Sequence, residues 1–399
     1  MMENRIALIV GGGIGGLTTA LALCRRGWAV HVLEAAPALE EVGAGLQLSP
    51  NAMKVIQALG LSAQIADVAF EPEALELRLS QSGRKVFSIP AGAAARRRWG
   101  APYYHIHRAD LLAVLEDALR QEALATISLG TQVISYNHEG DGAHVLLESG
   151  EPLAADLVIG ADGIRSRIRE QMLGPDEPRF TGNMAWRMVV PIDQLTTPPP
   201  PTACVWAGRG RHAVTYRLRG GKLANLVGVV ERADWVEEGW MQAGSREEAL
   251  EDFAGWAPEI TDIIQNADHH YRWALFDRAP LARWHDGAVA LLGDACHPML
   301  PFMAQGAAMA IEDAYTLAAC LDGQRSKSEA LVQYEAQRKP RTSRVQVASR
   351  GNMRTFHRSN PLMRASTYGP MWLAGHLMPG FVQSRQDWIY SHDVTATDR

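Results

Sequence analysis

The chain has 399 residues, of which 47% are hydrophobic and 21% are charged, so it is long enough for two or three domains with a large core. Its net charge of −5 at pH 7 excludes the basic surplus of a nucleic-acid-binding protein, and we expect no nucleic-acid partner. The four cysteines lack metal-like C-x-x-C spacing, and the N-terminus lacks the shape of a signal peptide. We therefore expect a cytoplasmic protein without a metal site.

The first 36 residues predict a nucleotide-binding unit. Residues 6–10 are a short apolar run of the kind that forms a buried parallel strand. A glycine cluster at 11–16 follows, then a stretch with helical periodicity at 17–26, and then a second apolar strand at 29–33 that ends at Glu34. This order of strand, turn, helix and strand with a terminal acid is typical of dinucleotide-binding folds.

The glycine cluster contains G-x-G-x-x-G, and its glycines have physical tasks. Gly11 permits the tight turn, Gly13 lets a pyrophosphate approach the backbone, and Gly16 lets the helix pack on the strand. Gly15 lies in the same turn, and the helix N-terminus presents unpaired N–H groups and a positive dipole end to the phosphates. Glu34 stands where an acceptor for ribose hydroxyls belongs. The motif predicts a dinucleotide but does not separate NAD from FAD.

Further along the chain, the predicted elements continue to alternate between helix and strand. Ser49 and Pro50 are typical of an N-cap and a first helical position, so a helix is predicted from there to Leu59. A strand end and an amphipathic helix follow at 105–121, and another buried strand is predicted at 156–160.

The residue pattern changes in the second half of the chain. Trp-rich segments of alternating polarity at 180–271 predict a mostly antiparallel sheet. A strand at 288–292 then leads into a long loop and a helix from about Gln305, and the chain stays helical to near Arg350. The apolar stretch 368–383 is interrupted by prolines and glycines and is too short to span a bilayer. We expect a packed surface helix there and no stable membrane insertion.

Three motifs occur in a specific order: G-x-G-x-x-G at 11–16, ADGIRSRIR at 161–169 and LLGDACHPMLPFMAQGAAMAIEDA at 291–314. In this order they resemble the motifs of the single-component FAD-dependent aromatic hydroxylases. The resemblance is greatest to the branch of the salicylate, 3-hydroxybenzoate and 6-hydroxynicotinate hydroxylases, and GAGLQLSPNA and HRADL also match that branch. It covers the chain to roughly residue 350 and leaves the substrate open.

The resemblance implies an α/β fold with three parts. These are a discontinuous, Rossmann-like FAD-binding domain of the GR2 type, an inserted and mostly antiparallel β-sheet domain for the substrate, and C-terminal helices. The expected bounds are 1–75, 100–178 and 280–350 for the FAD-binding domain, 76–99 and 179–279 for the substrate-binding domain, and 351–399 for the C-terminal helical segment. The branch suggests a monomer or a homodimer.

The resemblance also implies which residues hold the flavin half of FAD. Asp294 matches the aspartate that binds the ribityl chain, and an acid after a strand can hydrogen-bond a polyol. The helix that begins at Gln305, Gly306 and Ala307 would point its N–H groups at the flavin pyrimidine edge, where negative charge develops on reduction. Arg108 resembles the arginine that reaches the phosphate or ribityl region, and a surface ion pair is its alternative role.

Further contacts to the cofactors are implied elsewhere. Glu34 would accept the adenosine ribose, and backbone near Val133 would touch adenine. Asp162 and Gly163 match a motif associated with both FAD and the incoming nicotinamide nucleotide, and a turn after a strand is the alternative explanation. The Gly43–Gly45 loop lies where such enzymes let the flavin swing between two positions.

The implied reaction uses NAD(P)H, with NADH expected rather than NADPH, and O2. The nicotinamide nucleotide would bind transiently, since the sequence has no second G-x-G-x-x-G. Reduced flavin would form a C4a-hydroperoxide whose distal oxygen passes to an electron-rich ring. The pocket must then exclude water, and a base should deprotonate the substrate hydroxyl. His297, in DACHP, is expected to support the Asp294 turn rather than to act as that base.

His212, in GRHAVTY, is the candidate base. Strand alternation places His212 and Tyr216 on one face, and the matching histidine and tyrosine of the resembling branch line the substrate site. The structural alternative for His212 is a buried histidine that is hydrogen-bonded within the sheet, and Arg187 has both a substrate-site and a structural explanation. Phe302 departs from the polar residue that related enzymes can carry, which suggests an apolar wall of the substrate site.

We therefore predict an FAD-dependent monooxygenase that hydroxylates a small phenolic aromatic, a hydroxybenzoate such as salicylate or 3-hydroxybenzoate. A hydroxypyridine or another N-heterocycle is an alternative substrate, and so is a lipophilic phenol of quinone biosynthesis. The alternative from another class is a flavin-binding protein without turnover, which would hold FAD but show no substrate-stimulated NADH oxidation.

Overall fold

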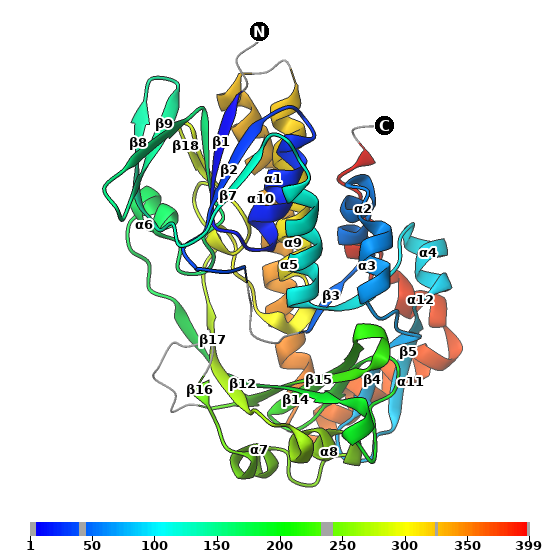
Figure 1. The fold of residues 1–399 in the computed structure, drawn as a ribbon. Helices are drawn as coiled ribbons and strands as arrows, with labels where there is room; N and C mark the ends of the chain where they lie inside the picture. Colours follow the sequence, from blue (N-terminus) through cyan, green and yellow to red (C-terminus); the bar gives the residue numbers. More distant parts are fainter. Residues whose placement is uncertain (1–4, 40–44, 233–241, 324–325, 397–399) are drawn as a thin grey trace.

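The computed structural model describes residues 5–39, 45–232, 242–323 and 326–396 (Figure 1). Two large sheets organise these residues: a six-stranded sheet that includes the N-terminal strand, and an eight-stranded sheet at the opposite end of the molecule. A three-stranded and a two-stranded sheet complete the β structure of the described part of the chain.

The six-stranded sheet is built from segments that lie far apart in the sequence. Its strands are, in order, β18 (His285–Asp286), β19 (Val289–Leu291), β11 (Leu157–Gly160), β1 (Ile6–Val10), β2 (Ala29–Leu33) and β7 (Ala125–Ser128). All neighbours are parallel except β18 and β19. This topology confirms the discontinuous, Rossmann-like nucleotide-binding fold.

Both faces of this sheet are covered. Helices α5 (Arg108–Arg120) and α9 (Gly306–Asp322) pack against α1 (Ile14–Cys24) on one side. A three-stranded antiparallel sheet lies along the other side (Figure 1). Its strands are β8 (Val133–Glu139), β9 (Gly142–Leu147) and β10 (Pro152–Ala155). Because neither face meets water, β11 and β19 consist wholly of buried residues.

The eight-stranded sheet has an outer and an inner face. Its strands are, in order, β16 (Gln242–Ala243), β17 (Tyr271–Asp277), β12 (Arg179–Pro191), β15 (Leu223–Glu231), β14 (Arg211–Leu218), β13 (Ala203–Ala207), β4 (Ala74–Leu79) and β5 (Lys85–Pro90). All neighbours are antiparallel except β13 and β4. Helices α7 (Arg246–Asp252) and α8 (Pro258–Asn266) cover the outer face over a core that contains Trp186, Trp206 and Phe253. The inner face is therefore left for contacts with the nucleotide-binding half.

The remaining elements join the two halves or cover their edges. They are β3 (Gly45–Leu48), β6 (Tyr104–His107), α2 (Pro50–Ala58), α3 (Ser62–Val68), α4 (Ala93–Trp99), α6 (Arg167–Leu173), α10 (Lys327–Phe356), α11 (Pro361–Leu377), α12 (Pro379–Ser384) and α13 (Asp387–Tyr390). Helix α10 has 30 residues and reaches from β18 to the eight-stranded sheet, where Arg350 pairs with Asp277 of β17.

The predicted fold class is confirmed, with corrections to several boundaries. The first helix begins at Ile14 rather than at residue 17, because the glycines of the turn let the helix start against β1. Gly45, expected in a loop with Gly43, instead begins the strand Gly45–Leu48, which pairs with β6. Helix α10 continues past Arg350 to Phe356. Among the described residues, none of the helices combines the length and apolar character that a membrane-spanning segment needs.

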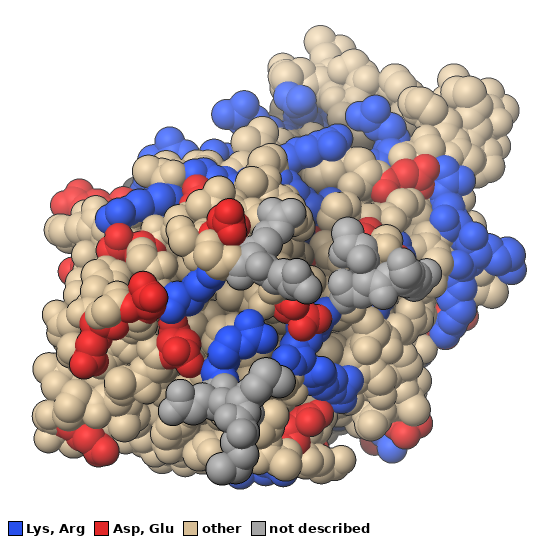
Figure 2. Space-filling view, turned by 90° about the horizontal axis from the view of Figure 1, so that it is seen from above, with Lys and Arg blue, Asp and Glu red and all other residues tan. Residues whose placement is uncertain are grey.

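The surface carries charges of both signs. Seen from above, Lys and Arg side chains lie among Asp and Glu side chains over most of the exposed face (Figure 2). Ion pairs at the surface include that of Arg98 with Asp387 at 2.6 Å. Because such exposed pairs contribute little to stability, the charges that matter for the fold lie inside.

An ion cluster is buried between α9 and α10. Arg338 donates from Nε to Asp313 at 2.7 Å and from Nη1 to Glu312 at 2.6 Å. None of these three side chains is more than 1% exposed. Burial alone would raise the pKa of Glu312, but Arg338 and Arg341 outweigh it and lower the pKa to about 2. The cluster therefore holds ionised carboxylates inside the protein, where they depend on their partners.

Replacing Arg338 by methionine leaves Asp313 without its guanidinium partner and Glu312 with one cation fewer. We expect Arg338→Met to lower the free energy of unfolding by about 3–5 kcal/mol, since a buried carboxylate then lacks compensation. The midpoint of urea unfolding, followed by circular dichroism, measures this loss. Arg354→Met, at an exposed position of the same helix, is the control. Equal midpoints for the two variants would contradict a stabilising role of the cluster.

Candidate active site

The glycine turn between β1 and α1 has the expected shape. Gly11 has a φ of 108°, and a Cβ there would lie 2.4 Å from the carbonyl oxygen of Ala161. A Cβ on Gly16 would lie 1.9 Å from the Gly11 oxygen, so only glycine fits at both positions. The Cβ position of Gly13 meets no atom within 4 Å, so a phosphate has room to approach the backbone there.

Glu34 stands at the end of β2 against this turn. Its Oε2 accepts the Gly12 N–H at 2.6 Å, and its Oε1 accepts the Ala36 N–H at 2.8 Å. Its backbone oxygen accepts the Thr131 N–H at 2.7 Å, which brings the start of β8 at Val133 close to it. The two residues predicted for the adenosine side of FAD therefore lie beside the same turn.

Asp294 lies in a short 3-10 turn, Gly293–Ala295, directly after β19. Asp313 of α9 holds this turn, because it accepts the N–H of the first turn residue at 3.3 Å and contacts Nε2 of His297. The supporting role predicted for His297 is thereby confirmed. The Asp294 side chain is open to solvent although protein surrounds it deeply. This depth raises its pKa, and the charge of Arg108 opposes the shift.

The N-terminus of α9 follows closely. Gln305 is its N-cap residue, but its side chain does not cap the helix. It donates instead to Ser49 Oγ at 2.9 Å and accepts from Asn51 at 3.1 Å. The first N–H groups of the helix, at Gly306 and Ala307, receive no side-chain cap from Gln305 and suit an electronegative ligand.

The glycine turn, the Asp294 turn and α9 lie side by side. A Cβ on Gly15 would lie 2.7 Å from Leu292 and 3.4 Å from Ala310 of α9. A Cβ on Gly293 would lie 3.2 Å from the same Ala310 side chain. Three of the sequence motifs therefore converge on one region of the molecule, since β11 with its ADG segment also borders Gly11.

Asp162, in that ADG segment, has one carboxylate oxygen in structural hydrogen bonds and one without a partner among the described residues. Its Oδ2 accepts the N–H groups of Arg167 at 2.8 Å and Ile168 at 3.2 Å at the start of α6. Its Oδ1 is buried and has no hydrogen-bond partner among the described residues. Gly163 next to it has a φ of 75° and open space at its Cβ position. A structural role and a ligand contact are therefore compatible at Asp162.

Arg187 of β12 places a positive charge on the inner face of the eight-stranded sheet, since its neighbour Trp186 points into the outer core. Its guanidinium lies 5.6 Å from the ring centroid of Trp273. Burial lowers its pKa to about 10, while nearby Tyr216 raises it and Arg108 lowers it further. No carboxylate of the described residues forms an ion pair with Arg187, so this guanidinium is available to an anion.

β14 carries two predicted substrate residues on its inner face. Thr215 points to the outer core, and His212 and Tyr216 point the other way, as strand alternation predicts. The Tyr216 hydroxyl donates to the Gly45 oxygen at 2.7 Å, and a Cβ on Gly45 would lie 2.3 Å from the Tyr216 ring. β14 and the start of β3 are thus in close contact, whereas Gly43 lies outside the described residues.

His212 and Phe302 are in contact. His212 is 1% exposed, and its ring centroid lies 5.2 Å from that of Phe302 in an edge-on arrangement. Burial lowers the pKa of His212 well below its ordinary value, and the charge of His357 adds to this effect. The imidazole is therefore neutral near pH 7, with a lone pair on one of its ring nitrogens.

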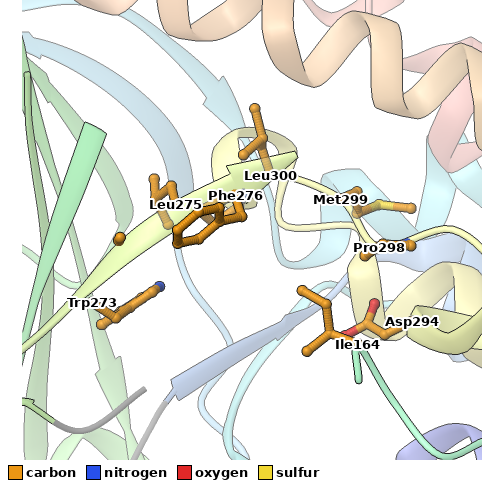
Figure 3. A pocket seen from close by; sticks show the side chains of 10 residues that line it. Ile164, Trp273, Leu275, Phe276, Asp294, Pro298, Met299 and Leu300 are labelled. Atoms are coloured by element: carbon orange, nitrogen blue, oxygen red, sulfur yellow. The ribbon is translucent and has the colours of Figure 1, made fainter. Parts of the chain in front are cut away.

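A cavity of about 110 Å³ lies between β17 and the loop after the Asp294 turn (Figure 3). Trp273 and Leu275 of β17 line one side, and Met299 and Leu300 of the loop line the other. Asp294 closes one end and is the only charged residue of the lining. The volume has room for several water molecules. Leu300 and Trp273 belong to the same buried cluster as Phe302, and the Phe302 ring contacts His212.

Sequence reasoning missed several residues of this region. Trp273 lies just beyond the predicted Trp-rich segments at 180–271, and its aromatic type is the only signal that could have pointed to it. Ile164 and Leu300 lie inside two of the recognised motifs, but their apolar side chains carry no chemical signature. His357 lies beyond the part of the chain that the motifs cover, and it contacts His212 only through the tertiary fold.

A family model described as FAD binding domain matches residues 5–349, which is most of the chain. The chain belongs to this FAD-binding family. The residues present fit the cofactor, because the turn at Gly13 is open, the buried Oδ1 of Asp162 lacks a partner, and the first N–H groups of α9 have no side-chain cap from Gln305.

Relatives of this chain are named as enzymes of the predicted class. The 3-hydroxybenzoate 6-hydroxylase 1 of Aquipseudomonas alcaligenes is 37% identical over 350 residues, which are 88% of each chain. The 6-hydroxynicotinate 3-monooxygenase of Pseudomonas fluorescens is 38% identical over 94% of this chain and 96% of that protein. The predicted resemblance and the class of FAD-dependent aromatic monooxygenase are confirmed.

Solved structures agree with this assignment. HpxO from Klebsiella pneumoniae, complexed with FAD and uric acid, has a TM-score of 0.82 at 26% identity and covers 95% of this chain and 96% of that chain. A salicylate hydroxylase substrate complex has a TM-score of 0.81 at 26% identity and covers 99% of this chain and 97% of that chain. The FAD-binding fold therefore extends over nearly the whole chain.

Proposed function

We propose that this FAD-dependent monooxygenase hydroxylates a small phenolic ring that carries a carboxylate, with a hydroxybenzoate such as salicylate or 3-hydroxybenzoate as its substrate class. The observation that carries the proposal is the apolar cavity beside Asp294. Trp273 lines this cavity and has the Arg187 guanidinium over its ring, so a cation stands close to an aromatic-sized space. An anionic ring would find its apolar and charged partners there.

A hydroxypyridine carboxylate is the second candidate substrate. It has the same combination of ring, hydroxyl and carboxylate, and a relative at 38% identity is named for 6-hydroxynicotinate. Phe302 favours the benzene ring, because an apolar side chain against His212 offers no hydrogen bond to a ring nitrogen.

FAD, when bound, takes a hydride from NADH or NADPH and delivers one oxygen atom of O2 to the ring. We propose that NADH is the preferred donor. The adenosine and pyrophosphate of FAD would contact Gly11, Gly13, Gly15, Gly16, Glu34 and the backbone at Val133. The flavin half would contact Arg108, Asp162, Asp294, Gln305, Gly306 and Ala307, with Gly45 at the edge of the site.

The chain itself would bind, orient and deprotonate the substrate. As a neutral imidazole with a lone pair, His212 would take the phenolic proton and make the ring a better nucleophile. Phe302 and the apolar lining would exclude water from the reacting atoms. Tyr216, whose hydroxyl donates to Gly45, would form part of the wall beside His212.

The domain division and the cellular setting are also proposals. The eight-stranded sheet, with β4 and β5, supports a substrate-binding domain at 76–99 and 179–279 beside an FAD-binding domain at 1–75, 100–178 and 280–350. All four cysteines are free and buried, which suits a cytoplasmic protein. A monomer or a homodimer is the proposed assembly.

The function is tested by O2 uptake of the purified, FAD-loaded protein with NADH. We expect uptake to rise on addition of salicylate or 3-hydroxybenzoate and a product with one added oxygen to form, detected by mass spectrometry. Catalase distinguishes this product from uncoupled H2O2 formation, and 6-hydroxynicotinate tests the second candidate. If none of these rings stimulates uptake, a flavin-binding protein without this turnover becomes the better description.

Asp294→Ala tests the proposed ribityl contact. Loss of a carboxylate hydrogen bond should weaken FAD binding by about 10- to 100-fold, so the variant should lose most of its flavin on purification. The ratio of absorbance at 450 nm to absorbance at 280 nm measures retention. Asp193→Ala, which removes an exposed carboxylate of the substrate-binding half, is the control and should stay yellow. A fully flavin-loaded Asp294→Ala protein would remove Asp294 from the binding site.

His212→Ala tests the proposed base. We expect normal FAD content but a roughly 100-fold slower hydroxylation, because general base catalysis is lost. His269→Ala, at an exposed histidine of the same half, is the control. Unchanged rate and unchanged coupling of NADH oxidation to product would assign His212 to a structural role.

A further inference from the structure

Three ionisable side chains form a hydrogen-bonded chain that starts at His212. His212 Nδ1 lies 2.7 Å from His357 Nε2, and His357 Nδ1 lies 3.0 Å from Glu231 Oε1. The three residues come from β14, the C-terminal end of α10 and the last position of β15. We call Glu231, His357 and His212 the Glu231 relay.

The Glu231 carboxylate at the end of the relay determines which ring nitrogen of each histidine carries the proton. A carboxylate only accepts, so His357 must carry its proton on Nδ1. A neutral His357 then presents Nε2 as an acceptor, and His212 must carry its own proton on Nδ1. The lone pair of His212 is therefore on Nε2, which makes no hydrogen bond to any described residue. In this tautomer, Nε2 of His212 can accept a proton from the substrate.

The relay also runs from the interior to the surface. His212 is 1% exposed and His357 is 6% exposed, whereas the Glu231 side chain is 57% exposed. At its inner end, the His212 ring packs on Phe302, a neighbour of the cavity residues Trp273 and Leu300. The distances of 2.7 Å and 3.0 Å between the linked atoms are short enough for proton transfer. Of the three side chains, only that of Glu231, at the outer end, is exposed to water.

We propose that His357 and Glu231 are positioning and proton-transfer residues, which hold His212 in the Nδ1–H tautomer and carry the phenolic proton of the substrate to solvent. The proposal rests on the proposed function, in which His212 is the base. When the substrate O–H breaks, its proton binds His212 Nε2, and the Nδ1 proton of His212 passes to His357 Nε2. The Nδ1 proton of His357 passes to Glu231, which releases it to water, and the phenolate keeps the electron pair.

Charged side chains around the relay affect the protonation of its histidines. Arg211 of β14 faces His357, and its positive charge opposes protonation of that imidazole. Arg232, next to Glu231, pairs with Asp252 at 3.0 Å rather than with the relay. Burial lowers the pKa of His357, and Glu231 opposes the shift by a hydrogen bond and by its charge. Among the described residues, Glu231 is thus the acidic group that favours a proton on His357.

The tautomers provide a first test that needs no substrate. In the FAD-loaded protein with ¹⁵N-labelled imidazoles, two-bond ¹H–¹⁵N spectra distinguish Nδ1–H from Nε2–H, and His212→Ala and His357→Phe assign the signals. We expect His212 as Nδ1–H in the unaltered chain and a mixture of tautomers in His357→Phe. A His212 that carries its proton on Nε2 in the unaltered chain overturns the proposal.

The pH dependence of turnover provides the second test, with 3-hydroxybenzoate as the probe. Glu231→Gln should keep FAD content but lower kcat at least about tenfold, because the amide does not take up a proton. Loss of the negative charge should also shift the acid limb of the kcat/KM profile to lower pH, since protonation of the histidine pair is then less favourable. Glu231→Asp should restore part of the rate. Glu247→Gln, at an exposed glutamate of α7, is the matched control and should retain the profile of the unaltered chain.

The outcomes separate the relay from the function on which it rests. An active unaltered chain, with Glu231→Gln at the same rate and the same acid limb, overturns the relay and leaves the hydroxylase intact. No substrate-stimulated O2 uptake by the unaltered chain overturns the proposed function, and with it the proton transfer that the relay was proposed to perform. The tautomer spectra then still decide whether Glu231 and His357 position His212.

Discussion

The ion cluster of Arg338, Glu312 and Asp313 is the interaction on which the arrangement of the site depends. Buried carboxylates are tolerated only when cations and hydrogen bonds compensate them, so the cluster specifies how α9 and α10 must pack. Glu312 also accepts from Asn51 at 2.7 Å, and Asp313 contacts His297. One cluster therefore connects the two long helices, the start of α2 and the turn that carries Asp294.

This packing has consequences at both ends of the molecule. On the nucleotide side, Asp313 holds the Asp294 turn, while Gln305 bonds to Ser49 and leaves the first N–H groups of α9 without a side-chain cap. On the other side, α10 continues for 30 residues and ends where His357 meets β14. The same helix thus supports the proposed flavin site and delivers a histidine to the proposed base.

The surroundings of the side chains near the cavity determine which of them are neutral and which are charged. Burial keeps the His212 imidazole neutral, whereas Arg187, which has no carboxylate partner among the described residues, remains a cation beside Trp273. A neutral base and a positive charge around an apolar space suit an anionic phenol better than a neutral hydrocarbon. Asp162 also combines two roles. One of its oxygens accepts a hydrogen bond from the start of α6, and the other has no partner among the described residues and could contact a ligand.

The sequence by itself determined the glycine turn, the position of Glu34, the Asp294 loop and the alternation that puts His212 and Tyr216 on one face. These features depend on short spacings, and backbone geometry converts a short spacing into a fixed local shape. Only the tertiary structure decided that Gly45 begins a strand against Tyr216, that Arg187 lies over Trp273, and that His357 joins His212 to Glu231. The links of the relay are 145 and 126 residues apart in the chain. Contacts at such separations depend on strand register and on where a long helix ends, and these are set by packing rather than by any local pattern.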